Sequence, residues 1–159
     1  MNKEDFIILL KEYKENKAKL NIKLKELKTK RIKLKYCDDT ETNMTSSYGI
    51  NQDIHSKNQI SDKVLRKVEE NETKREQLKE EIKDLEEEVR ILREKVEAVE
   101  DRLECLRYKE KELLCAYYID GRTYVDIGNN LYFKLFAQTR DKDTIKRIVE
   151  NAMGKMLNL

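Results

Sequence analysis

The sequence predicts an all-α protein, in which a long coiled-coil stalk or a hairpin of two long helices precedes a small C-terminal bundle of helix-turn-helix outline. Three observations support this fold class. Charged residues make up 42% of the 159 residues and hydrophobic ones 38%, a mixture typical of long helices with a narrow apolar seam. The chain contains no proline, the strongest helix breaker. Apolar residues recur at alternating steps of three and four along both long segments, as in heptad repeats.

The first long helix is expected over residues 4–36, and a polar loop over residues 37–61. Lys17 and Arg31 interrupt the seam of the helix. Its apolar members are Phe6, Leu10, Tyr13, Leu20, Leu24, Leu27 and Leu34. Residues 37–61 are rich in Asp, Asn, Ser and Thr, whose side chains compete for backbone hydrogen bonds. We therefore expect this segment to reverse the chain.

The second long helix is expected over residues 62–113, and its partner is left open by the sequence. Its seam places β-branched residues at heptad position a and leucine at d, which favours a parallel two-stranded homodimer. Its members are Leu78, Ile82, Leu85, Val89, Leu92, Val96, Val99, Leu103 and Leu106. Net charge favours a hairpin within one chain, because the first helix is basic and the second is acidic. A four-helix arrangement would combine the hairpin with the homodimer.

The pattern of residue types changes near residue 113, which divides the chain into a coiled-coil region, residues 1–113, and a head, residues 114–159. In the head, Gly121 is placed to end a helix, and Thr123 and Asp141 are placed to cap the next two. The last helix has one apolar face, made of Ile145, Ile148, Val149, Ala152, Met153 and Met156. Its opposite face is polar and mostly basic. A capped short helix, a turn and a second helix with a basic outer face have the outline of a helix-turn-helix.

The run LLCAYYIDGRTYVDIGNNLYF, followed by DKDTIKRIVENAMGKM, resembles the DNA-reading module of sigma factor region 4 and of related phage regulators. With the long helical N-terminal half, the chain resembles the ArpU/RinA-like late transcription regulators of phages and prophages. The resemblance covers the layout of the whole chain and is specific over residues 113–156. One departure is the longer separation of Ile127 and Ile145, with the surplus at residues 134–140. This surplus fits an extended first helix, an extra turn or a disrupted turn.

The resemblance implies that the last helix enters the major groove of double-stranded DNA. The implied base contacts are Thr144, Arg147 and Asn151. The implied phosphate contacts are Arg122, Lys142, Lys146 and Lys155. RNA polymerase is an implied further partner. Two alternatives are a structural coiled-coil scaffold or adaptor without DNA binding, and a sigma-like or anti-sigma factor that contacts polymerase without reading bases.

The sequence gives no sign of an enzyme, a cofactor or a metal site. It contains no glycine-rich phosphate loop and no nucleophile beside a base. Cys37, Cys105 and Cys115 lack metal-ligand spacing and are expected to be reduced thiols. No apolar run approaches the ~20 residues needed to cross a bilayer. We therefore expect a cytoplasmic protein without membrane contact.

Overall fold

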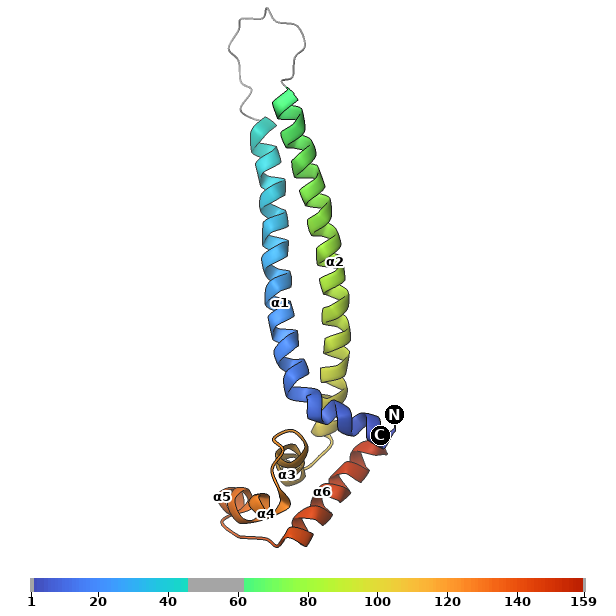
Figure 1. Ribbon diagram of the computed structural model, residues 1–159. Helices are drawn as coiled ribbons and strands as arrows, with labels where there is room; N and C mark the ends of the chain where they lie inside the picture. Colours follow the sequence, from blue (N-terminus) through green and yellow to red (C-terminus); the bar gives the residue numbers. More distant parts are fainter. Residues whose placement is uncertain (1, 46–61, 159) are drawn as a thin grey trace, which may run out of the picture. The chain divides into compact units, whose positions relative to one another are not determined.

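The computed structural model describes residues 2–45 and 62–158, and side chains in residues 38–45 and 62–67 are left undescribed. The described residues contain helices and turns but no strand, which confirms the predicted all-α class. Figure 1 shows the helices α1 (Lys3–Thr45), α2 (Asp62–Glu104), α3 (Tyr108–Tyr118), α4 (Tyr124–Asp126), the π-helical turn η1 (Ile127–Leu131), α5 (Tyr132–Phe136) and α6 (Lys142–Leu157).

Two expected boundaries differ from the structure. Helix α1 continues past residue 36 to Thr45, so residues 37–45 of the expected loop are helical, and the rest of that loop lies outside the described residues. The expected helix over 62–113 is interrupted between Glu104 and Tyr108. Here Arg107 has an extended backbone, and its N–H donates to Glu110 Oε2 at 3.3 Å. Glu110 thus helps to cap α3.

The chain divides into two compact units, which we call the head unit (residues 1–20 and 91–159) and the stalk unit (residues 21–90). This division differs from the sequence-based boundary at residue 113. The reason is that the first turns of α1 and the last turns of α2 share a hydrophobic core with the helices that follow them. A segment at the start of the chain therefore belongs to the same unit as its end.

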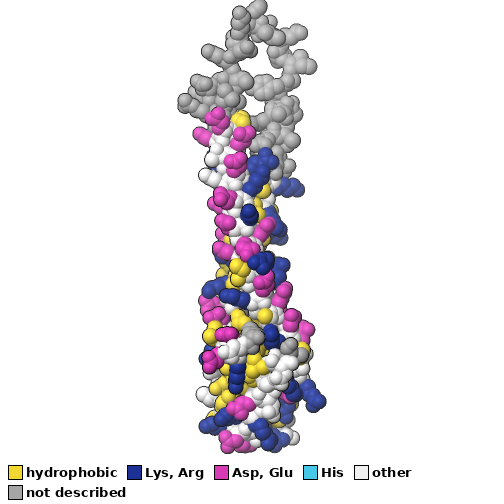
Figure 2. Space-filling model, turned by 90° about the vertical axis from the view of Figure 1, so that its right-hand side faces the viewer, with side chains coloured by type: hydrophobic (Ala, Val, Ile, Leu, Met, Phe, Trp, Pro, Cys, Tyr) yellow, Lys and Arg dark blue, Asp and Glu magenta, His cyan; other side chains and the backbone are white. Residues whose placement is uncertain are grey.

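In the stalk unit, α1 and α2 run antiparallel, so the hairpin is the arrangement that the structure contains (Figure 1). The buried seam is made of Leu27, Ile82, Leu85 and Val89. Ion pairs flank this seam at Lys23–Glu88 (2.8 Å), Lys30–Glu81 (3.0 Å) and Arg31–Glu86 (2.7 Å). Solvent screens such exposed pairs, so burial of the seam contributes most of the stability and the charges select the partner. Figure 2 shows hydrophobic side chains as small patches among charges of both signs.

The head unit has two hydrophobic clusters, and α6 contributes to both. The first cluster joins α1, α2, α3 and the C-terminal half of α6, and its buried members are Phe6, Leu10, Val99, Leu103, Leu106, Leu114, Ala152, Met153 and Met156. The second joins α3, η1, α5 and the N-terminal half of α6, and its buried members are Leu113, Ala116, Ile127, Tyr132, Ile145 and Val149. The predicted apolar face of α6 is thus confirmed, with Ile148 half-buried. Packing along its whole length holds α6 firmly.

Candidate nucleic-acid interface

The turn between α3 and α4 forms as its sequence predicts. Gly121 has φ 69°, the left-handed conformation that suits glycine after a helix end. Thr123 caps α4, because its Oγ1 accepts a hydrogen bond from the backbone N–H of Asp126 at 3.3 Å. The rings of Tyr117 and Tyr124 stack across this turn with centroids 4.1 Å apart. The turn therefore connects α3 rigidly to the helix that precedes α6.

The surplus residues 134–140 lengthen that helix and then form the turn into α6. Helical backbone runs from Tyr124 to Phe136 and includes the wide turn η1. Ala137, with φ 54°, then ends the helix in the left-handed conformation. A π-helical turn holds one more residue than an α-helical turn, and after it Tyr132 is buried in the second cluster with Phe136 packed against that cluster. Of the arrangements expected for these residues, the extended helix is therefore observed, and a turn at residues 137–140 follows it.

Gly128 allows the turn at residues 137–140 to lie close to the backbone of η1. The backbone N–H of Arg140 donates to the Gly128 carbonyl at 3.2 Å. A Cβ on Gly128 would lie 2.2 Å from the Arg140 carbonyl oxygen. The closest contact of this glycine is therefore with the turn before α6. Lys109 supports the same region, with its Nζ 4.6 Å from the centroid of the buried Tyr132 ring.

The start of α6 is fixed by a side-chain cap, as predicted. Asp141 Oδ2 accepts from the backbone N–H of Thr144 at 3.1 Å, and Asp141 Oδ1 accepts from Thr144 Oγ1 at 2.6 Å. The hydrogen bonds from the Thr144 hydroxyl and N–H hold the pKa of Asp141 below its usual value. The Thr144 hydroxyl, which the family resemblance placed at a base, is thus engaged in this cap.

The outer face of α6 is exposed and carries most of the remaining site residues. They are Lys142, Lys146, Arg147 and Asn151. Lys146 Nζ lies 3.9 Å from Glu150 Oε1, and both side chains are more than half exposed, so this pair is weak. Arg147 and Asn151 are four residues apart and therefore lie on the same side of the helix. In the described part of the chain, neither has a side-chain hydrogen bond or ion pair.

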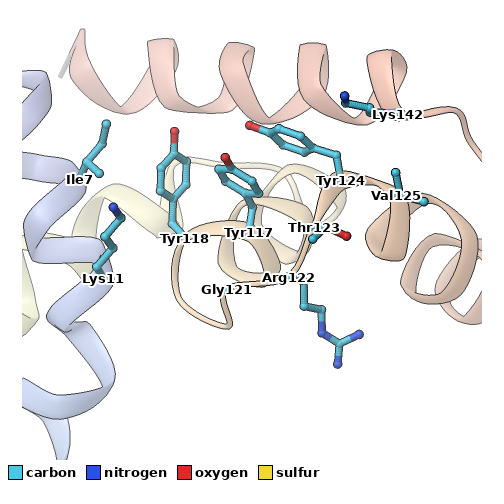
Figure 3. Close-up of a pocket in the computed structure, with 10 residues that line it drawn as sticks. All are labelled: Ile7, Lys11, Tyr117, Tyr118, Gly121, Arg122, Thr123, Tyr124, Val125 and Lys142. Atoms are coloured by element: carbon cyan, nitrogen blue, oxygen red, sulfur yellow. The ribbon is translucent and has the colours of Figure 1, made fainter.

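Two further residues that the resemblance placed at phosphates have partners within the head unit. Lys155 Nζ lies 2.6 Å from Glu110 Oε1, and this bond holds the pKa of Glu110 below its usual value. Lys155 thereby ties the end of α6 to α3. Arg122 lies 3.7 Å from Asp126, and its side chain extends away from α6 in Figure 3. Arg122 lies outside α6, whereas Lys155 follows Asn151 by four residues on the same side of α6 but is held by Glu110.

An open groove of about 680 Å³ lies beside the start of α6 (Figure 3). Tyr117, Tyr118 and Tyr124 are half-buried, pack against the second cluster and line this groove. Burial is the main cause that raises the pKa of Tyr124 and Tyr118. Lys11 of α1 lines the same groove as Lys142. The sequence carries no local signal for Lys11, because only the tertiary fold brings α1 near α6.

The described residues offer little for other chemistry. They contain no group of three or more His, Cys, Asp or Glu side chains that could hold a metal ion. Burial raises the pKa of the Cys115 thiol to about 11, so this thiol is protonated at neutral pH and a poor nucleophile. None of the described helices is both long enough and apolar enough to span a membrane.

Comparisons with known proteins found no match to this chain among family models, curated proteins or solved structures.

Proposed function

We propose that this protein is a DNA-binding transcription regulator, of the sigma factor region 4-like type, whose α6 enters the major groove of double-stranded DNA. One observation carries the proposal. Lys146, Arg147 and Asn151 project from one face of α6, while the opposite face is buried in the two clusters of the head unit. A helix that is held by its core and exposes a basic and amide face has the form that major-groove recognition requires.

The exposed side chains suit different parts of the duplex. The guanidinium of Arg147 can donate two hydrogen bonds to O6 and N7 of guanine, and the amide of Asn151 can pair with N6 and N7 of adenine. Lys142 and Lys146 supply charge for phosphates, which adds affinity without sequence information. Asp143 and Glu150 share this helix and lower its net positive charge. We therefore expect weak binding by a single head, strengthened by a second head or by RNA polymerase.

The resemblance to ArpU/RinA-like regulators supports a role in the late genes of a phage or prophage, in the bacterial cytoplasm. A second candidate function is a coiled-coil scaffold or adaptor that binds no DNA, and the helical hairpin of the stalk unit favours it. That reading leaves the exposed polar face of α6 without a role. We therefore prefer the regulator.

Selection of duplexes from a random library tests the proposal. The full chain is incubated with DNA that has a randomised centre of about 20 base pairs, two turns of the helix, and bound duplexes are sequenced over several rounds. We expect an enriched motif that contains guanine and adenine, bound far more weakly when salt rises from about 50 to 200 mM. If no motif is enriched although the protein is recovered in every round, the proposed DNA-binding function is contradicted and the adaptor function is favoured.

A further inference from the structure

A second heptad stripe runs along the outside of α1 in the stalk unit. Its members are Ile22, Lys25, Thr29, Ile32 and Tyr36, spaced by alternating steps of three and four. Ile22 is 63% exposed, Ile32 46% and Tyr36 67%. They are the exposed large hydrophobic side chains of α1 among the described residues of the stalk unit. Exposed apolar residues that repeat with this period indicate a surface for another helix.

The stripe adjoins an apolar groove with a basic rim. The groove has a volume of about 330 Å³ and lies entirely on α1. Leu24, Leu27 and Ile32 supply its apolar lining, and Lys28 and Lys35 its cations, beside Arg31, which pairs with Glu86 of the same chain. No acidic side chain lines it. The helix that fits here must therefore carry carboxylates beside its contact face.

The acidic helix of the same fold meets this requirement. Residues 68–90 of α2 contain ten Asp or Glu and five Lys or Arg. Glu76 and Glu80, four residues apart on one face, are exposed. On α1, Lys25 and Lys28 are exposed, and within the described residues neither has an ion pair. Within one chain, the heptad seam of α2 is already occupied by α1. A further contact with α2 must therefore use its outer acidic face and come from another molecule.

We propose that a second copy of this chain docks on the outer stripe of α1, with its acidic α2 face against Lys25 and Lys28. Under two-fold symmetry, α1 of each copy packs on α2 of the other. The product is a four-helix bundle in which basic and acidic helices alternate. Packing α1 on α1 instead would place lysines opposite lysines. The inference differs from a parallel dimer through the α2 seam, which would require the hairpin to open, and it does not depend on DNA binding.

Sedimentation velocity of the full chain tests the surface. The mass of one chain is 19.1 kDa. At micromolar concentration, the wild type is expected to sediment as a dimer of twice this mass. Ile22→Glu combined with Ile32→Glu is expected to give a monomer with unchanged helicity by circular dichroism. Tyr108→Glu, which alters an exposed aromatic residue of the head unit, is the matched control and stays dimeric. A monomeric wild type, or a dimer that survives the double substitution, overturns the proposal.

Charge exchange tests which helices meet. One variant carries Lys25→Glu and Lys28→Glu, and the other carries Glu76→Lys and Glu80→Lys. Each alone is expected to be monomeric, because its own α1 and α2 faces then repel between copies. Mixed together, they are expected to form a heterodimer, since both interfaces regain opposite charges. If the Glu76→Lys, Glu80→Lys variant remains a homodimer, the α1–α2 arrangement is wrong.

Discussion

Replacing Lys146 and Arg147 together with alanine is expected to lower affinity for the selected DNA site by about 100-fold and to remove most sequence preference. One bidentate guanine contact contributes about 1–3 kcal/mol of discrimination, and the lost phosphate contact adds to this. Fluorescence anisotropy at fixed salt measures the change. Both side chains are exposed, so circular dichroism should show unchanged helicity.

A matched pair of single substitutions separates a cation of α6 that has no partner among the described residues of the head unit from one that is bonded to α3. Arg147→Ala and Lys155→Ala each remove one positive charge from the same helix. Lys155 is bonded to Glu110 at 2.6 Å, so its removal is expected to leave DNA affinity within about threefold, whereas Arg147→Ala weakens it by at least tenfold. Equal losses in the two variants would mean that α6 acts only through general electrostatic attraction.

Gly128→Ala is expected to destabilise the head by about 2–3 kcal/mol, as overpacking of a well-packed core does. The added Cβ would lie 2.2 Å from the backbone carbonyl oxygen of Arg140, and backbone cannot rotate away as a flexible side chain can. The turn that leads into α6 must therefore move, with loss of the bond from the Arg140 N–H to the Gly128 carbonyl. Urea denaturation measures the loss of stability, and anisotropy measures the accompanying loss of DNA affinity.

Gly154→Ala provides the control for this substitution. Gly154 lies inside α6, and no atom lies within 4 Å of the position that its Cβ would take. Because alanine favours helices over glycine by about 1 kcal/mol, this variant is expected to be equally stable or more stable. A Gly128→Ala protein as stable as Gly154→Ala would show that the turn at residues 137–140 is not packed as described.

Local patterns predicted the helices well but not their long-range partners. The seam of α2, the apolar face of α6 and the caps at Thr123 and Asp141 follow from short-range spacing, and all are observed. Phe6, Leu10 and Met153 belong to one cluster that joins opposite ends of the chain, which no local period encodes. The heptad pattern likewise specified a seam without specifying whether its partner was the same chain or another copy.

The same limit applied to the candidate site. Helical spacing placed Lys146, Arg147 and Asn151 on the outer face of α6, where the structure has them exposed. It could not reveal that Lys155 meets Glu110, because the two lie 45 residues apart. The hydroxyl of Thr144 was assigned to DNA although the capping aspartate three residues earlier competes for it. A polar side chain in the first turn of a capped helix should therefore be tested as part of the cap first.

Site-directed DNA cleavage is the most direct test of the claim that α6 enters the major groove. A copper-phenanthroline group is attached to a cysteine introduced by Asp143→Cys, an exposed position in the first turn of α6 that is not a proposed DNA contact, in a chain whose three native cysteines are replaced by alanine. The account predicts cuts confined to the selected site on both strands. The same reagent attached through Lys83→Cys, on the exposed side of α2, should cut the DNA weakly and at no preferred position. Uniform or absent cleavage from position 143, with DNA bound, would contradict the account.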